Sequence, residues 1–203
     1  MTEKNLISSY PNLKLNYWAV PKSANTTVKL CLNNPTQEKN VSLQSIYTKQ
    51  KWVHKEKNIP QISVNEALTN NFLNFSVVRH PYDRLLSLYK DFGLRRPWKN
   101  IFNGKKVSLD QFIDKVCVEW KDNNFVENKH AYSQAYYLTN DNNKILVEKI
   151  IDIKNLNYFF HSKNIKIGIF NKTPEICVTL TNSQKDIIFR RYEEDFDFFK
   201  YQK

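Results

Sequence analysis

Apolar and polar positions follow two different periods along this chain. Short, largely apolar runs are typical of buried strands, and each of them is followed by a polar residue or a proline. These runs predict four strands, at residues 16–20 (NYWAV), 75–79 (FSVVR), 148–153 (EKIIDI) and 165–170 (IKIGIF).

Apolar residues at helical spacing lie between and after these runs. They predict helices at residues 26–32, from 81 onward, at 108–120 and at 183–199. The second helix begins with Pro81 at its first position, carries Asp83 in its first turn and places Leu85 and Leu88 on one face. The third begins at Ser108, which acts as its N-cap.

Strands that alternate with helices predict a three-layer α/β fold with a mainly parallel sheet. No internal repeat, low-complexity tract or linker divides the sequence, so residues 1–203 are expected to form a single domain. A chain of this length can bury a sufficient core without disulfides or a structural metal. In such sheets ligands bind at the carboxyl ends of the strands, which directs attention to residues 21–27 and 79–89.

The net charge of the chain indicates what kind of partner it binds. Lys and Arg number 31 against 20 Asp and Glu, which gives a net charge of +11. An anionic partner is therefore expected, either a nucleic acid, a nucleotide, a phosphorylated or sulfated glycan, or an acidic membrane. The basic residues are spread along the chain and no nucleic-acid-binding signature occurs, so a nucleic-acid-binding module remains only an alternative.

Other features exclude several classes of protein. No run of ~18 apolar residues occurs, and the N-terminus lacks the basic and apolar regions of a signal peptide, so neither a membrane span nor secretion is expected. The histidines have no metal-binding spacing, which predicts no metal. The cysteines are far apart and odd in number, which favours buried thiols in a reducing, cytoplasmic setting; they are Cys31, Cys117 and Cys177.

The first candidate site is the segment 21–27 (PKSANTT), between a predicted strand and a predicted helix. The free N–H groups of a first helical turn, the hydroxyls of Thr26 and Thr27 and the ammonium of Lys22 suit a phosphate-like group. A Walker A loop is excluded because the segment has no glycine. The alternative interpretation is a strand ended by proline and followed by an ordinary capped helix.

The second candidate site is the segment 79–89 (RHPYDRLLSLY). Arg79 ends a predicted strand, and Ser87 lies on the polar face of the following helix. The two side chains are spaced to hold one phosphate from two sides. Alternatively, Arg79 is a salt-bridge partner and Ser87 a solvated helix residue.

Together these two segments resemble the 3′-phosphoadenosine 5′-phosphosulfate (PAPS)-dependent sulfotransferases, in particular the carbohydrate (Golgi-type, family 2) enzymes that modify glycans. Residues 20–27 (VPKSANTT) are similar to the 5′-phosphosulfate loop of that family, and 75–92 (FSVVRHPYDRLLSLYKDF) to its 3′-phosphate motif. Ala24 departs from the glycine frequent there. Weaker similarities continue at 130–134 (HAYSQ), 170–173 (FNKT) and 192–201 (YEEDFDFFKY).

The resemblance implies a P-loop NTPase-like sulfotransferase fold, PAPS as sulfuryl donor and no metal. Lys22 is expected to stabilise the leaving group, as in phosphoryl transfer. His54 is expected to be the general base, with His130 as its rival. The residues expected to bind the donor are Lys22, Ser23, Ala24, Asn25, Thr26, Thr27, Arg79, Ser87 and Thr173.

The acceptor is expected to be a carbohydrate or another hydroxyl-bearing compound, possibly acidic. A basic, aromatic loop follows the second helix, although it reads equally well as a solvated loop. The residues expected to contact the acceptor are His54, Arg95, Arg96, His130 and Gln134. A nucleotide-dependent kinase is a further alternative, but neither its Walker A loop nor its magnesium-binding carboxylates are found.

Overall fold

The computed structural model describes residues 6–33, 35, 60–120, 126–167 and 177–203. They group into two compact units. The sheet unit lies within residues 1–78 and 136–172, and the helical unit within residues 79–135 and 173–203. The expectation of a single domain stays a prediction, because a domain is defined by independent folding and not by the grouping of contacts.

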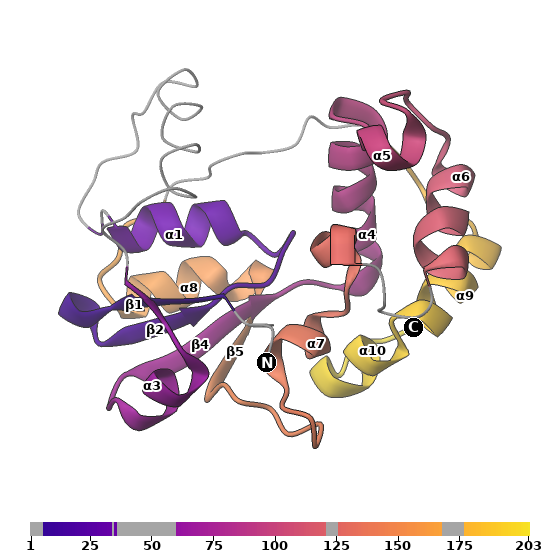
Figure 1. The fold of residues 1–203 in the computed structure, drawn as a ribbon. Helices are drawn as coiled ribbons and strands as arrows, with labels where there is room; N and C mark the ends of the chain where they lie inside the picture. The colour runs from indigo at the N-terminus through magenta and orange to yellow at the C-terminus, as the bar shows by residue number, and fades with distance from the viewer. Residues whose placement is uncertain (1–5, 34, 36–59, 121–125, 168–176) are drawn as a thin grey trace. The chain divides into compact units, whose positions relative to one another are not determined.

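A five-stranded sheet in the order β3-β1-β2-β4-β5 forms the centre of the sheet unit (Figure 1). Strands β2, β4 and β5 are mutually parallel, and β1 is antiparallel to both β2 and β3. Only β1 therefore runs against the others, as the prediction of a mainly parallel sheet requires. The strands are β1 (Ile7–Tyr10), β2 (Leu15–Trp18), β3 (Gln61–Ile62), β4 (Leu73–Val78) and β5 (Lys149–Asp152).

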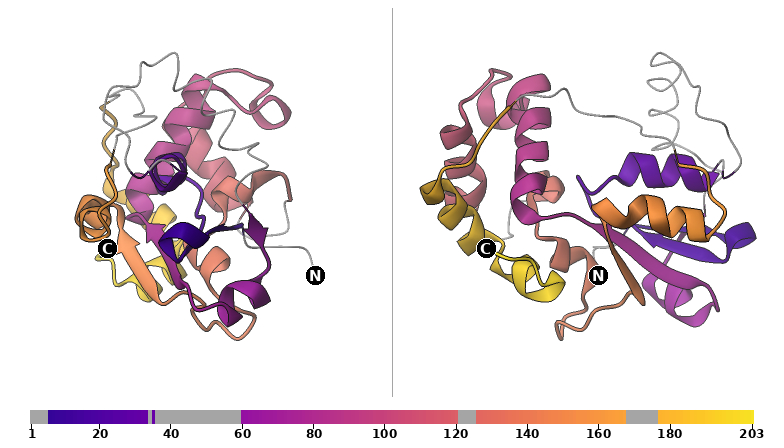
Figure 2. Two further views of the ribbon diagram at one scale, coloured as in Figure 1. Left: turned by 90° about the vertical axis from the view of Figure 1, so that its left-hand side faces the viewer. Right: turned by 180° about the vertical axis from the view of Figure 1, so that it is seen from behind.

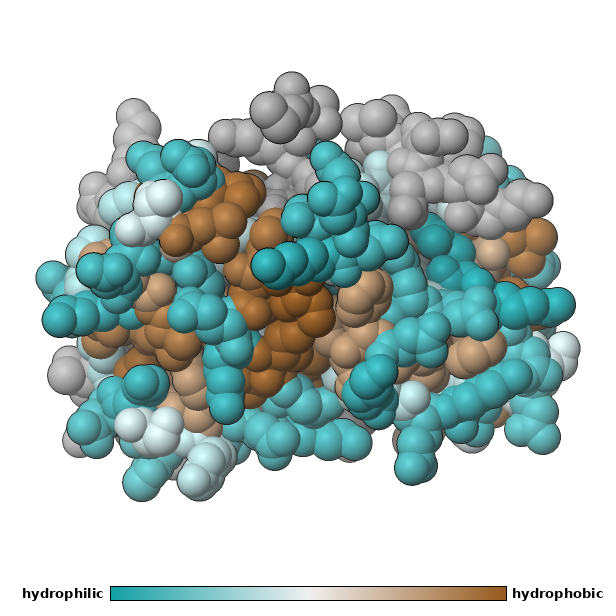
Figure 3. All heavy atoms as spheres, turned by 90° about the horizontal axis from the view of Figure 1, so that it is seen from below, coloured by the Kyte–Doolittle hydropathy of each residue, from teal (hydrophilic) through white to brown (hydrophobic). Residues whose placement is uncertain are grey.

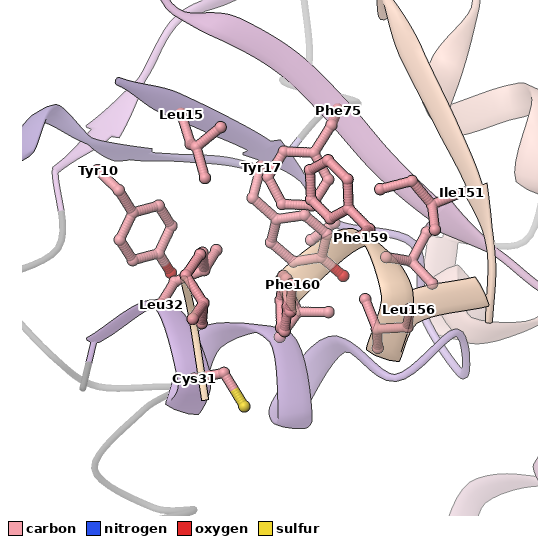
Figure 4. Packing of buried hydrophobic residues seen from close by; sticks show 14 residues of the cluster. Tyr10, Leu15, Tyr17, Cys31, Leu32, Phe75, Ile151, Leu156, Phe159 and Phe160 are labelled. Atoms are coloured by element: carbon pink, nitrogen blue, oxygen red, sulfur yellow. The ribbon is translucent and has the colours of Figure 1, made fainter. Parts of the chain in front are cut away.

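One face of the sheet carries the hydrophobic core of this unit (Figure 4). The two-residue period of a strand turns Leu15 and Tyr17 of β2 toward this face, together with Phe75 and Val77 of β4. Helices α1 (Asn25–Asn33) and α8 (Leu156–Ser162) cover it. The fully or nearly fully buried members include Tyr10, Leu15, Tyr17, Val28, Cys31, Leu32, Phe75, Val77, Ile151, Leu156, Phe159 and Phe160.

The opposite face is held by hydrogen bonds between buried polar side chains. Asn16 and Asn74 each donate from Nδ2 to the carbonyl oxygen of Ala67, over 3.3 and 2.9 Å, and Ala67 belongs to α3 (Val64–Thr69). Trp18 donates from Nε1 to Oδ1 of Asn74 over 2.9 Å. Helices therefore lie on both faces of the sheet, as the three-layer prediction requires.

The helical unit packs short helices around a second core. Its buried side chains come from α4, from α6 and the π-helical segment that continues it, and from α9 and α10. Figure 2 shows the ribbon from two further sides. The helices are α4 (Pro81–Tyr89), α5 (Lys99–Phe102), α6 (Leu109–Ile113), α9 (Asn182–Arg191) and α10 (Glu193–Phe199). Two π-helical segments, η2 (Lys90–Arg95) and η3 (Asp114–Glu119), continue α4 and α6. Helix α7 (Gln134–Leu138) begins in this unit, after the 3-10 segment η4 (Val126–Ala131).

Several predicted elements differ from the structure. The helix predicted at 108–120 begins as expected at Ser108, with a capping box to Gln111, but becomes π-helical at Asp114. The helix predicted at 183–199 is divided at Tyr192, whose φ of −120° ends α9. The strand predicted at 165–170 is wrong for residues 165–167, which are irregular, and its remainder lies outside the described residues.

The cysteine prediction holds for two of the three thiols. Cys31 and Cys117 are buried, and burial raises the pKa of Cys117 to about 12. Cys177 is exposed, so the expectation of a buried thiol is wrong there.

Hydrophilic side chains cover much of the surface seen in Figure 3. Among the described residues no helix has the length and apolar character needed to cross a membrane.

Candidate functional site

The first candidate site is the connection from β2 to α1. Strand β2 pairs in parallel with β4, with Trp18 opposite Ser76, so both strands end at the same edge of the sheet. Residues 21–24 form a turn, closed by a hydrogen bond from the Ser23 N–H to the Val20 carbonyl over 3.3 Å. Helix α1 then begins at Asn25 and carries no acidic residue in its first turn. Its N-terminal N–H groups and the positive end of its dipole therefore have no carboxylate of their own helix to neutralise them.

The backbone of this turn is strained in a way that suits an anion. Lys22 and Ala24 have φ values of 66° and 59°, in the left-handed region, and Ser23 between them is fully buried. For a residue with a Cβ this conformation costs about 1–2 kcal/mol. Successive backbone N–H groups in a turn that contains left-handed residues can form an anion-binding concavity. The alanine that replaces the frequent glycine thus occupies a position whose conformation favours glycine.

Two further groups at the start of α1 lack partners among the described residues. Oδ1 of Asn25 is buried and accepts no hydrogen bond. Lys29 is only 7 % exposed and has no ion pair with any described residue, and desolvation lowers its pKa. Residues four apart share a helix face, and helical side chains lean toward the N-terminus. Lys29 and Asn25 therefore share one face of α1 near its N-terminus.

The second candidate site begins where β4 ends. Arg79 follows Val78 directly, and its peptide groups are held by the side-chain amide of Gln134. The Arg79 N–H donates to Oε1 of Gln134, and Nε2 of Gln134 donates to the Arg79 carbonyl, each over 2.8 Å. Gln134 is fully buried. Its amide is therefore engaged with the backbone of Arg79.

Gln134 is in turn held by Asp195 of α10. The carboxylate of Asp195 accepts from the N–H groups of Gln134 and Ala135 over 3.0 and 2.8 Å. Burial raises the pKa of Asp195 to about 6, against the opposing effects of the Arg84 charge and of these two hydrogen bonds. Sequence reasoning missed Asp195, whose only signal was its place in the segment 192–201.

Arg84 fixes the segment that leads into Gln134. This arginine of α4 is 2 % exposed, and its Nη2 donates to the carbonyls of Tyr132 and His130 over 2.6 and 3.1 Å. The hydroxyl of Tyr192 donates to the Ala131 carbonyl over 2.9 Å. Residues 130–135 are thus held by side chains of α4 and α10 and by Tyr192, which lies between α9 and α10.

His80 and Ser87 lie in and next to α4. His80 is the N-cap, and its Nδ1 accepts from the Tyr82 N–H, while its Nε2 lies 3.1 Å from the Gln202 carbonyl oxygen. Ser87 is half-buried. It lies ~9 Å along the helix axis from Pro81 at 1.5 Å per residue. Arg79 therefore lies just before the N-cap of α4, and Ser87 lies in the last turn of that helix.

The predicted acceptor residues Arg95 and Arg96 share one carboxylate. Asp91 is buried and accepts from both guanidinium groups, over 2.6 Å from Arg95 and 2.8 Å from Arg96. The guanidinium of Arg96 lies 5.4 Å above the Phe92 ring, and the exposed His130 meets the same ring edge-on at 5.0 Å. The structure thus brings Arg96 and His130 together around Phe92.

Other predicted site residues fall elsewhere. His54 and Thr173 lie outside the described residues, and their expected roles stay predictions. Residues 22–27 belong to the sheet unit, whereas the other predicted site residues that the structure describes belong to the helical unit. Within the described part of the chain, no group of three metal-ligating side chains occurs.

Comparison with known proteins identifies the class of this protein. The model of the sulfotransferase family matches residues 7–202, nearly the whole chain. The chain therefore belongs to the sulfotransferase family, the family of the carbohydrate (Golgi-type) enzymes. Searches of curated proteins and of solved structures gave no significant match. Membership establishes a transferase class and implies an acceptor that bears a hydroxyl group.

Proposed function

We propose that this protein transfers a sulfuryl group from PAPS to a hydroxyl of a carbohydrate or glycan acceptor. The observation that carries the proposal is the turn at the carboxyl end of β2. It combines left-handed residues at Lys22 and Ala24 with a helix N-terminus that has no acidic residue in its first turn. These features suit the 5′-phosphosulfate group, which is anionic and has many acceptor oxygens.

The residues present fit such a group in three respects. The hydroxyls of Thr26 and Thr27 and the N–H groups of the first turn are donors, as anionic oxygens require. The buried Oδ1 of Asn25 lacks a partner, and rotation of the amide presents Nδ2 in its place. Lys29 adds a second cation that has no carboxylate partner among the described residues.

Lys22 is proposed as the catalytic cation. PAPS would supply an activated sulfuryl group. When the acceptor hydroxyl takes that group, the bond between sulfur and the bridging phosphate oxygen breaks, and negative charge develops on that oxygen. An ammonium beside that oxygen stabilises charge that develops mainly in the transition state. Lys22 should therefore affect turnover more than donor affinity.

Arg79 and Ser87 are proposed to hold the 3′-phosphate. A guanidinium forms two parallel hydrogen bonds to phosphate, and a hydroxyl adds a donor from another direction. Arg79 directly follows β4 in the sequence, and β4 pairs in parallel with β2, the strand that leads into the first segment. The two segments follow neighbouring strands, and each is proposed to bind one of the charged groups of a nucleotide that carries charge at both ends of its ribose.

The residues proposed to act on the acceptor come from the sequence and from the cluster of side chains around Phe92. His54 remains the proposed general base, with His130 as its rival. Arg96 and His130, which meet around Phe92, are proposed to contact the acceptor. Because Asp91 neutralises part of the charge of Arg95 and Arg96, the pair presents a net charge of about +1 and tolerates a neutral sugar as well as an acidic one.

A comparison of nucleotides tests the proposal. Adenosine 3′,5′-bisphosphate should raise the melting temperature far more than adenosine 5′-phosphate or ATP, because only the bisphosphate engages both segments. Ligand at ~100 times its Kd contributes about 2.7 kcal/mol. Arg79→Ala should abolish the preference for the 3′-phosphate, whereas Arg190→Ala, an exposed position of α9, should not. Equal stabilisation by all three nucleotides would contradict the proposal.

A further inference from the structure

We infer that Gln134 and Asp195 are positioning residues that hold Arg79 in the conformation needed to bind the 3′-phosphate. The inference rests on the proposed function and adds to it two residues that never touch the nucleotide. Its basis is a continuous chain of hydrogen bonds from the Asp195 carboxylate through Gln134 to the backbone of Arg79.

The first step concerns the backbone of Arg79. Its N–H and its carbonyl group both bond to one side-chain amide, over 2.8 Å each, in the manner of a paired strand. With both peptide groups fixed, the direction of the Cα–Cβ bond is fixed as well. A guanidinium that must meet a phosphate bidentately tolerates little error in that direction, because the geometry of two parallel hydrogen bonds is strict.

The second step concerns the amide of Gln134. The side-chain amide of Gln134 can fix the peptide groups of Arg79 only if the backbone of Gln134 is itself fixed. Asp195 supplies this restraint, since its two carboxylate oxygens accept separately from the N–H groups of Gln134 and Ala135. Both Asp195 and Gln134 are fully buried, so water does not replace these bonds when one is lost.

The third step concerns cost. A buried carboxylate is unfavourable unless it is compensated, and here burial raises its pKa. The groups that act on it are the charge of Arg84, the two backbone N–H groups, the nearby Glu194 and the buried Tyr192. An amide at position 195 would avoid this cost but supplies only one acceptor oxygen for two donors. The carboxylate is therefore the residue type that holds both N–H groups at once.

Two isosteric variants test the inference. Gln134→Glu keeps the acceptor for the Arg79 N–H but turns a carboxylate oxygen toward the Arg79 carbonyl. Asp195→Asn turns an NH₂ group toward one backbone N–H. Calorimetry on the full chain, well below the melting temperature, should show at least 10-fold weaker binding of adenosine 3′,5′-bisphosphate for each variant. Affinity for adenosine 5′-phosphate should stay within about twofold.

Two controls separate positioning from general stability. Tyr192→Phe removes the hydrogen bond to the Ala131 carbonyl but leaves the chain to Arg79 intact, so it should lower stability and retain the preference for the 3′-phosphate. Glu194→Gln changes an exposed neighbour of Asp195 and should leave both affinities unchanged. In an Arg79→Ala background, Gln134→Glu should have no further effect on binding of the bisphosphate.

The outcomes separate the two proposals. If the wild-type protein binds the two nucleotides equally, the proposed function fails. If the wild-type protein prefers the bisphosphate and Gln134→Glu retains that preference, or loses affinity for both nucleotides alike, the positioning role is overturned. If Asp195→Asn does not fold, Gln134→Glu decides on the same criterion.

Discussion

The pH dependence of stability should carry a contribution from Asp195. Burial raises its pKa from 3.8 to about 6, although Arg84 and two backbone N–H groups oppose this shift. The folded protein therefore holds the proton of Asp195 more tightly than the unfolded chain does. It follows that this residue favours folding most below pH ~4 and loses that contribution as the pH rises to ~6.

The magnitude follows from the size of the shift. A difference of about 2 pKa units corresponds to ~3 kcal/mol at 1.36 kcal/mol per unit. Many other groups titrate in the same range, so the wild-type curve alone does not isolate Asp195. The free energy of unfolding of Asp195→Asn provides the reference, because that variant has every other titratable group and no charge at position 195.

Urea unfolding from pH 4 to pH 7, followed by tryptophan fluorescence, measures this contribution. The wild-type free energy of unfolding, minus that of Asp195→Asn, should fall by about 2–3 kcal/mol over this range. A constant difference would show that the pKa of Asp195 is not raised in the folded protein. A difference that grows with pH would show that the two backbone hydrogen bonds outweigh burial and lower the pKa instead.

Four further changes should alter stability, two of them upward and two downward. Tyr17→Phe should raise the free energy of unfolding by about 1 kcal/mol, because the buried Tyr17 hydroxyl has no partner among the described residues. Tyr192→Phe should lower it by about the same amount, because the Tyr192 hydroxyl donates to the Ala131 carbonyl. Urea unfolding measures both. Lys29→Met should raise the melting temperature at pH 7 but weaken binding of adenosine 3′,5′-bisphosphate. The gain in stability should shrink as the pH rises toward the ordinary lysine pKa of 10.5, because burial makes the folded protein release the Lys29 proton first. Gly93→Ala should cost about 1–3 kcal/mol, because a Cβ there would lie 2.5 Å from Cδ2 of Tyr89; an unchanged melting temperature would contradict this.

The elements that carry the candidate site follow local rules and were predictable. Strand β4 and helix α4 match the apolar run at 75–79 and the helix from Pro81, within a few residues. Helix α1 begins at Asn25, one residue before its predicted start. Each of these elements buries one side at a regular period, and that period is visible in the sequence.

Elements held by buried polar groups were not predictable. Strand β1 (ISSY) has two serines that are buried, and Ser9 donates to Oδ1 of Asn16 over 3.0 Å. An apolar pattern does not indicate such a strand, because its burial is compensated by hydrogen bonds instead of apolar contacts.

The links within the candidate site are of the same kind. Gln134 and Arg79 are 55 residues apart, and Asp195 lies a further 61 residues along the chain. No local period connects residues at such separations. The resemblance to a family indicated that these segments matter, but only the structure shows that they converge on one peptide unit.

The most direct test of the central claim is the formation of adenosine 3′,5′-bisphosphate from PAPS, measured by mass spectrometry against a panel of sugars and glycans. The wild-type protein should form one molecule of the bisphosphate for each molecule of sulfated product. Lys22→Ala should lower turnover far more than donor affinity, and Lys154→Ala, an exposed lysine of the same unit, should match the wild type. Normal turnover by Lys22→Ala, or no release of the bisphosphate by the wild type with any acceptor, would contradict the account.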